Sequence, residues 1–269
     1  MQPLARAAIS TFQSVRFVLT YMDETLTYQG RLAARTYAAL ERLQQAGVKV
    51  IVVTAAPAGW CDKMARMWPV DGVIGENGGC FFHRNSESHG LVRTFWHPAK
   101  DRQNISERLA AIGKQVRAVV PDAAYAEDQP FRLTSVAFTQ PEDPGSRAAI
   151  IAALRAAGAN VTVNNLWVLG WLGGYDKLTM ARRVLSESYD LDVDVDRDAV
   201  LYVGDSTNDA PMFGFFPHTV GVSTVTDYLS EIPTPPNWVA AGPGGAGFVE
   251  AADAVILSRT QPSQDNGSP

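Results

Sequence analysis

The chain has few of the residues that mark several classes of protein. Among its 269 residues are only two cysteines, Cys61 and Cys80, and neither lies in a spacing typical of a metal site. We therefore expect reduced, structural thiols. The four histidines form no ligand-spaced pair, and we assign them no role. No stretch approaches the roughly 18 consecutive apolar residues that a membrane span requires.

Basic residues are also scarce, since the formal net charge is −5 and no run of Lys or Arg occurs. This argues against non-specific binding to nucleic acid or to an anionic membrane. The first 15 residues contain no apolar segment of the kind found in signal peptides, so we expect a cytoplasmic protein. A hydrophobic fraction of 46% with 19% charged residues is ordinary for a globular chain of one large or two modest domains. The oligomeric state cannot be read from the sequence.

The first part of the chain alternates between strand and helix patterns. Short apolar runs at 15–20, 48–53 and 72–75 predict buried strands. Between them, Leu32, Tyr37, Leu40 and Leu43 mark one face of a helix that ends near Gly47, and a short helix is expected over 61–67. This order predicts an α/β fold with a doubly wound parallel sheet.

The pattern changes in the middle of the chain and then returns. Strands resembling parts of hairpins are expected at 91–96, 132–139 and 160–169, with helices over 101–119 and 145–157 between them. We therefore expect a core of residues 1–82 and 172–260 with an inserted α+β domain at 83–171. The core resumes with a helix over 177–189 and strands at 199–203 and 219–222. From residue 258 the chain is polar, and residues 261–269 are expected to be a disordered tail.

Polar residues follow several of the expected core strands. The strand at 15–20 leads into Tyr21 and Asp23, the strand at 48–53 leads into Thr54, and the strand at 199–203 leads into Gly204-Asp205-Ser206-Thr207-Asn208-Asp209. Open α/β sheets bind their ligands at the carboxyl ends of the strands. Two carboxylates four residues apart can face one hard cation, although Asp209 could instead cap the helix that follows.

These segments resemble the motifs of the haloacid dehalogenase (HAD) superfamily of phosphatases. Residues 21–26 are similar to the first motif, DxDGT(L/V), and residues 204–209 to the fourth motif, GDxxND. Glu76-Asn77-Gly78-Gly79 resembles the ENG(A/G) turn of the Cof-like and sucrose-phosphatase-like subgroup, whose α/β cap is inserted where this chain has residues 83–171. A plain hairpin turn explains the Asn-Gly pair equally well.

The resemblance implies a role for each matching residue. Asp23 would handle the leaving-group proton, the Thr54 hydroxyl would bind a phosphoryl oxygen, and Lys177 would offset phosphate charge. Asp23, Asp205 and Asp209 would hold Mg²⁺, and Asn77, Gly78 and Asn208 are expected to bind substrate. An isolated Lys177 or Thr54 would more often be a surface or strand-end residue; their shared motif order favours the functional interpretation.

The chain departs from the family pattern at three places. Tyr21 stands where the family has its nucleophilic aspartate, which also binds the metal. A phenol has a pKa of about 10 and is mostly protonated at neutral pH, so it offers no anionic oxygen. Glu24 replaces a usual glycine, and Ala55-Ala56 replaces a frequent Gly-Arg pair that helps to bind phosphate.

Three functions are compatible with this pattern. The first is a Mg²⁺-dependent phosphomonoesterase acting on a small phosphorylated metabolite, such as a sugar phosphate, and impaired by Tyr21. The second is an inactive pseudo-phosphatase that binds a phosphorylated ligand or a protein partner. A purely structural role is the third, and the retained Asp23, Lys177, Asp205 and Asp209 argue against it. The substrate itself cannot be read from the sequence.

Overall fold

The computed structural model of the chain describes residues 1–85, 87–164 and 166–260, so the expected tail at 261–269 lies outside the described residues. The chain divides into two units. Unit 1 comprises residues 1–53, 68–71 and 185–269, and unit 2 comprises residues 54–67 and 72–184. The expected boundaries of core and cap stay a prediction. Within the described residues, no helix is long and apolar enough to cross a membrane.

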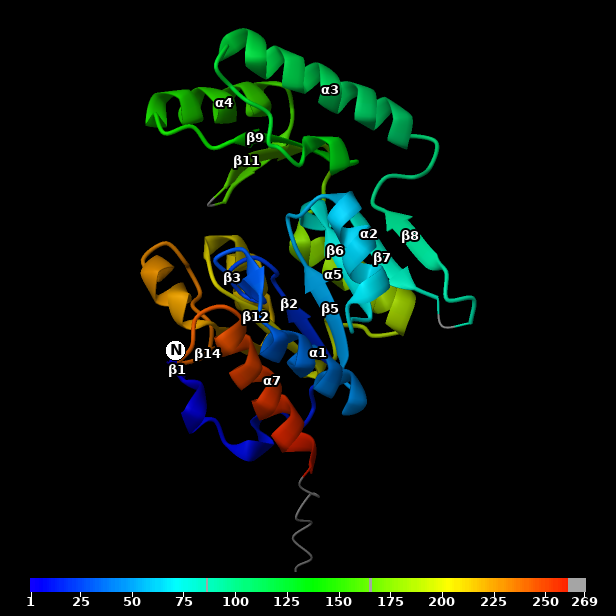
Figure 1. Cartoon of the computed structure of the whole chain (residues 1–269), viewed down its shortest axis with the longest axis vertical. Coiled ribbons are helices and arrows are strands. Elements are labelled where there is room, and N and C mark those ends of the chain that lie inside the picture. The colour runs from blue at the N-terminus through cyan, green and yellow to red at the C-terminus, as the bar shows by residue number, and fades with distance from the viewer. Residues whose placement is uncertain (86, 165, 261–269) are drawn as a thin grey trace, which may run out of the picture. The chain divides into compact units, whose positions relative to one another are not determined.

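Unit 1 is built on a parallel sheet with strand order β1-β14-β13-β12-β2-β5 (Figure 1). Neighbouring strands in this order pair in parallel, as expected for an α/β fold. Strand β2 lies between β12 and β5, and all four of its residues are buried. Three of them are apolar and the fourth is Thr20, so no charged group is buried there. The strands are Gln2–Pro3 (β1), Phe17–Thr20 (β2), Lys49–Val53 (β5), Val200–Gly204 (β12), His218–Gly221 (β13) and Trp238–Val239 (β14).

The helices of unit 1 differ from the prediction at the C-terminus. Helix α1 (Ala34–Gln45) forms as expected, but Leu32 lies in β4 (Arg31–Leu32), which pairs with β3 (Thr27–Tyr28). Helix α7 (Gly245–Thr260) packs against α1, and α6 is short (Ala210–Phe215).

Helix α7 was not predicted from the sequence, and residues 258–260, expected only to be polar, form its last turn. Helix α7 has alanine and other apolar residues around much of its circumference, so no helical period stands out. Its last turn is held because the Arg259 guanidinium donates to the carbonyls of Val15 and Ala46, at 2.9 and 3.1 Å.

The first part of unit 2 is a three-strand antiparallel arrangement covered by a helix. Strand β6 (Gly72–Gly75) pairs with β7 (Cys80–Arg84), which pairs with β8 (Leu91–Phe95). Helix α2 (Ala58–Met67) packs on β6 and β7 and begins earlier than expected. Cys61 on α2 and Cys80 on β7 are reduced and fully buried, as predicted. Hydrogen bonding with Cys61, together with burial, raises the pKa of the Cys80 thiol well above its usual value.

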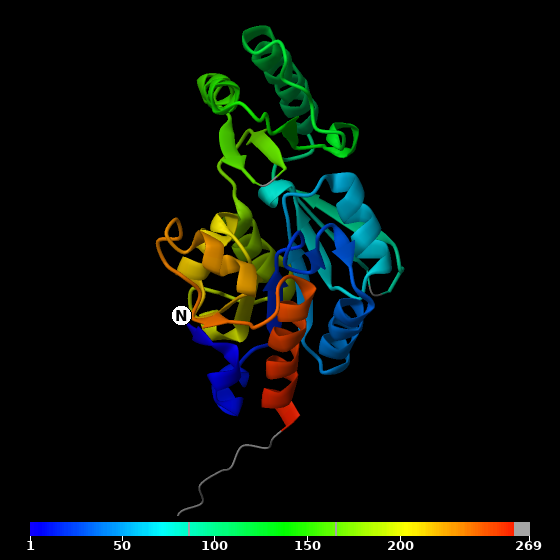
Figure 2. The ribbon, with the colours of Figure 1, turned by 60° about the vertical axis from the view of Figure 1, so that its left-hand side comes forward.

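The second part of unit 2 is a small sheet, β10-β11-β9, with helices α3 and α4 side by side on it (Figure 2). Helix α3 (Arg102–Val119) and helix α4 (Pro144–Ala156) form as predicted and share an apolar cluster with the sheet. The expected strand at 160–169 is in fact two strands, β10 (Asn160–Val163) and β11 (Trp167–Trp171), while β9 covers only Ser135–Thr139. Helix α5 (Lys177–Tyr189) follows, beginning in unit 2.

A single buried carboxylate, that of Glu76, joins the two parts of unit 2. Its Oε1 accepts from the backbone N–H of Ala58 (3.0 Å) and of Leu133 (2.8 Å). Its Oε2 accepts from the N–H of Thr134 (2.9 Å) and from the hydroxyls of Thr134 (3.1 Å) and Ser135 (2.5 Å). The side chain is 0% exposed. A buried charge is costly unless hydrogen bonds satisfy it, and here five donors do so.

We predict that Glu76→Gln destabilises the protein. Both carboxylate oxygens accept hydrogen bonds, so the amide group of glutamine would turn a donor toward at least two other donors. The expected loss is about 2–4 kcal/mol, which corresponds to a fall in Tm of roughly 5–10 °C. Thermal unfolding followed by circular dichroism measures it. The exposed Glu142→Gln should change Tm by less than about 2 °C. Equal Tm values for the two variants would contradict the prediction.

Candidate functional site

The polar residues predicted in unit 1 meet at the carboxyl ends of β2 and β12. These strands are neighbours, and the backbone N–H of Tyr21 donates to the Val203 carbonyl at 3.0 Å. Tyr21 is 4% exposed, so its phenol is buried at the strand end. The Thr25 hydroxyl donates to Oδ1 of Asp205 at 2.9 Å and joins the two loops. Asp23 is half-buried in the loop after Tyr21.

The loop after β2 is wound around one carbonyl oxygen, that of Met22. The backbone N–H groups of Leu26 and Thr27 donate to it at 2.9 and 3.0 Å. To make this turn, Glu24 adopts a left-handed backbone with φ 55°, a conformation that glycine adopts at little cost. The glycine usual at this place in the HAD pattern therefore has a conformational reason. Glu24 adapts to the position because its carboxylate accepts from the backbone N–H of Gln29 at 2.9 Å.

Asp209 is committed to its own turn. Its Oδ2 accepts from the N–H of Asp205 (2.9 Å) and of Ser206 (3.2 Å), and its Oδ1 accepts from the Tyr202 hydroxyl (2.5 Å). The side chains of Ser206 and Asp209 form a capping box over the 3-10 helix Thr207–Asp209, in which Asn208 is half-buried. Burial, with the nearby charge of Asp209, raises the pKa of the Tyr202 hydroxyl well above its usual value, so that hydroxyl acts as a donor. The Asp209 side chain therefore fixes the turn between β12 and α6, and it makes no side-chain hydrogen bond at the N-cap of α6.

Asp205 and Asp23 are acidic residues of this region that could contribute to a magnesium site. Mg²⁺ in proteins is often held by one or two carboxylates together with water and substrate oxygens. Asp205 is 3% exposed, and its Oδ1 accepts from the Thr25 hydroxyl. Asp23 lies on the loop after β2, and the resemblance gives its backbone carbonyl as a further metal ligand. Within the described parts of the chain, no three His, Cys, Asp or Glu side chains form a cluster able to hold a metal by themselves.

The polar residues predicted in unit 2 gather around the turn between β6 and β7. Thr54 is fully buried; its hydroxyl accepts from the N–H of Ala56 at 3.0 Å and its carbonyl from the N–H of Asn77 at 3.0 Å. The turn connects two antiparallel strands, so it is a hairpin turn as well as a match to the ENG(A/G) pattern. The two interpretations of this segment are compatible.

Asn77 carries an unpaired donor. It is 4% exposed, and its amide Nδ2 has no hydrogen-bond partner among the residues that the structure describes. The backbone is left-handed at Glu76 (φ 49°), Asn77 (φ 57°) and Gly78 (φ 111°). Three such residues in succession are rare and strained, which is typical of functional turns. An orphaned buried donor of this kind suits a ligand oxygen.

Lys177 lies beside this turn at the first position of α5. Asp176 caps the helix, because its Oδ1 accepts from the N–H of Thr179 at 2.7 Å. A Cβ added at Gly78 would lie 2.4 Å from the Asp176 carbonyl oxygen, so only glycine allows this approach. The turn is thus packed against the residue that precedes Lys177. Lys177 is 5% exposed, which is unusual for lysine and argues against a simple surface residue.

Two residues of this region were not predicted to matter. Glu76 was recognised only as part of a motif, although its carboxylate fixes the segment at 133–135. Arg132 is buried and forms a bidentate pair with Asp128, and its Nη1 donates to the Ala55 carbonyl at 3.0 Å. A glutamate before Asn-Gly and an Arg at i+4 from an Asp were visible in the sequence. Their partners, however, are distant in sequence.

Comparisons with known proteins identify the fold. No family model and no curated protein matches the chain. Among solved structures, the chain is similar to protein 0175 of Thermoplasma acidophilum, with TM-score 0.70 and 19% identity over 90% of this chain and 99% of that one. A trehalose-6-phosphate phosphatase related protein gives TM-score 0.60 and 14% identity, over 90% and 97%. A haloacid dehalogenase-like hydrolase from Bacteroides thetaiotaomicron gives TM-score 0.61 and 17% identity, over 90% and 99%. The chain has the fold of the haloacid dehalogenase-like hydrolases.

Proposed function

We propose that this protein is a phosphomonoesterase of the HAD type, impaired by Tyr21. The observation that carries the proposal is the pairing of β2 with β12, which sets Tyr21 beside the loop that contains Asp205. In the family pattern, the residue at the end of this strand attacks phosphorus. The fold alone would not support an activity, because one fold hosts many functions.

The phenol of Tyr21 changes this chemistry in two ways. It supplies no carboxylate to attack phosphorus or to bind a cation, and its ring is held rigidly where a short acidic side chain would stand. Loss of a nucleophile in other enzymes lowers the rate by about 10⁴–10⁶. We therefore expect very low activity from the natural chain.

Mg²⁺ is the proposed cofactor, which the Asp205 carboxylate would hold with help from the backbone carbonyl of Asp23. When bound, it would neutralise charge on a phosphoryl group. Asp205 keeps its orientation through the Thr25 hydroxyl, and Asp209 holds the loop in shape through the N–H groups of Asp205 and Ser206. Asp209 thus supports the site as a positioning residue.

The residues of unit 2 keep the roles that the resemblance gives them. The Thr54 hydroxyl is a donor for a phosphoryl oxygen, and the Lys177 ammonium offsets negative charge. The Nδ2 of Asn77, which has no partner among the described residues, would donate a hydrogen bond to a substrate oxygen. Asn208 is a further candidate for substrate contact. A sugar phosphate is the proposed substrate, which is supported by the likeness to a trehalose-6-phosphate phosphatase related protein.

A second candidate is a pseudo-phosphatase that binds a phosphorylated ligand without cleaving it. It is favoured by the burial of Tyr21, which shows a phenol accommodated in the fold at this position. The retained Asp23, Lys177 and Asn77 are compatible with binding alone. Activity of a repaired variant separates the two candidates.

We predict that Tyr21→Asp gains Mg²⁺-dependent phosphatase activity. The substitution supplies a nucleophile and a metal carboxylate together, and groups that act as a unit recover most of the rate when the only fault is repaired. Hydrolysis of 4-nitrophenyl phosphate should rise by at least about 10³-fold over the control variant Tyr21→Asn, which has the same shape without the charge. Adding Ala55→Gly and Ala56→Arg should lower KM further.

The outcome that would contradict the phosphatase proposal is equally definite. If the triple variant is folded by circular dichroism, binds Mg²⁺ and cleaves none of a broad panel of sugar phosphates, the proposal fails. The binding function would then take first place.

Asp205→Asn should weaken Mg²⁺ binding. Asparagine can keep the hydrogen bond from Thr25 through its amide oxygen but removes the negative charge, and charge count tunes the affinity for hard cations. Isothermal titration calorimetry should give a Kd for Mg²⁺ that rises about tenfold or more. Asp227→Asn, at an exposed carboxylate, serves as the control. An unchanged Kd in Asp205→Asn would show that the metal, if it binds, binds elsewhere.

A further inference from the structure

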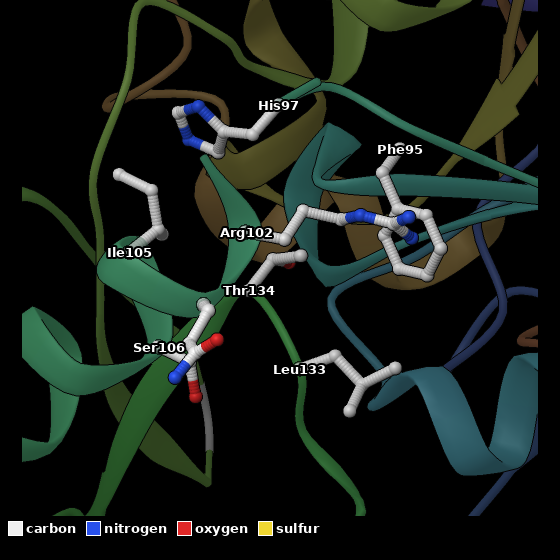
Figure 3. Close-up of a pocket in the computed structure, with 8 residues that line it drawn as sticks. Phe95, His97, Arg102, Ile105, Ser106, Leu133 and Thr134 are labelled. Atoms are coloured by element: carbon white, nitrogen blue, oxygen red, sulfur yellow. The ribbon is translucent and has the colours of Figure 1, made fainter. Parts of the chain in front are cut away.

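Unit 2 contains a pocket of about 260 Å³ that the proposed reaction does not use. It lies where β8 leads into α3, and the segment before β9 closes its other side (Figure 3). Its lining residues are Phe95, His97, Arg102, Gln103, Ile105, Ser106, Leu133 and Thr134. The pocket is therefore formed by residues from both parts of unit 2.

The walls of the pocket are largely apolar. Phe95 and Ile105 are half-buried, and Leu133 is 54% exposed although Thr134 beside it is buried. An isoleucine, a leucine and an aromatic ring around one hollow favour a flat apolar group as occupant. The volume is somewhat below the range of about 300–1,000 Å³ typical of drug-sized ligands, so the occupant is small.

The charge at the pocket is positive. Figure 3 shows the Arg102 side chain lying across the Phe95 ring, with the guanidinium carbon 4.5 Å from the ring centroid. Across the described residues, Arg102 forms no ion pair, and none of the eight lining residues is acidic. Of the acidic residues nearby on the chain, Asp101 is the N-cap of α3, and Glu107 accepts from the side-chain amide of Gln103 at 3.0 Å. Arg102 can therefore donate to an anionic group while remaining stacked on Phe95.

The floor of the pocket is held in place by hydrogen bonds to other parts of unit 2. The His97 ring donates through Nε2 to the Leu172 carbonyl at 2.8 Å, because a carbonyl can only accept. The backbone N–H and hydroxyl of Thr134 donate to the Glu76 carboxylate. A ligand that enters does not have to order these groups, which lowers the entropic cost of binding.

We propose that this pocket binds a small organic anion with a flat apolar body, its anionic group on Arg102 and its ring against Phe95, Ile105 and Leu133. Cations are disfavoured by Arg102, and a polyhydroxylated neutral molecule would leave the apolar wall uncovered. Carboxylate, sulfonate and phosphate groups share the chemistry that Arg102 recognises.

The test uses a matched pair of probes, naphthalene-2-sulfonate and its neutral analogue naphthalene-2-sulfonamide, titrated into the full chain by isothermal titration calorimetry. The sulfonate should bind at least about fivefold more tightly than the sulfonamide. In Arg102→Gln, the Kd of the sulfonate should rise about fivefold to tenfold. Arg117→Gln is the matched control, because Arg117 lies on the same helix and over an aromatic ring, that of Tyr125, at 5.6 Å. It should bind the sulfonate as the natural chain does.

A second variant and a local readout place the ligand. Leu133→Trp fills the pocket from an exposed position and should abolish binding of the sulfonate. Amide hydrogen exchange at residues 133–135 should slow when the sulfonate binds, because these amides adjoin the pocket. The proposal is overturned if the sulfonate does not bind the natural chain at millimolar concentration, if the two probes bind equally, or if Arg102→Gln and Arg117→Gln behave alike.

Discussion

The buried carboxylate of Glu76 is the interaction on which unit 2 depends most. It takes its donors from the start of α2 and from the segment that leads into β9, while Glu76 itself lies in the turn between β6 and β7. Three stretches of chain far apart in sequence therefore share one charged group. Hydrophobic contact alone would allow these stretches to slide, whereas five directional bonds define one arrangement.

The same carboxylate stabilises a backbone that is unfavourable on its own. Glu76, Asn77 and Gly78 are all left-handed, and the two non-glycine residues each cost about 1–2 kcal/mol. The hydrogen bonds of Glu76 offset this strain and keep the Asn77 side chain buried with a donor unpaired. The proposed contact with substrate and the internal architecture of unit 2 thus rest on adjacent residues.

Much of the fold could be predicted because its signals are local. Apolar runs identified β2, β5 and β6, and helical spacing identified α3 and α5. Helix α7 was missed because its apolar residues are not confined to one face. The strand predicted at 160–169 is two antiparallel strands, β10 and β11, and the sequence between them has no glycine or proline to mark the break. Where the signal depended on partners distant in sequence, local patterns could not supply it.

Some residues of the candidate site could be identified from the sequence, whereas the roles of others depend on contacts seen only in the structure. The sequence placed Tyr21 and Asp205 directly after two core strands. In the structure these strands are neighbours, and the loops after them are joined through the Val203 carbonyl and the Thr25 hydroxyl. The sequence could not decide whether Asp209 faces a cation or caps its helix, since both need a carboxylate at that spacing. Its side chain accepts from Asp205, Ser206 and Tyr202 and makes no cap hydrogen bond to α6, so its role toward a cation stays a prediction. Glu76 and Arg132 act through contacts that no spacing reveals.

The burial of both cysteines means that the folded protein presents no reactive thiol of its own within the described residues. Cys61 and Cys80 are the only thiols of the chain, both are 0% exposed, and the Cys80 thiol is held in its protonated form. Because the thiolate is the species that reacts with alkylating reagents, neither should be modified while the protein is folded. A cysteine introduced on the surface would then be the single reactive position, and fluorescent or spin labels could be attached to the otherwise natural chain one site at a time.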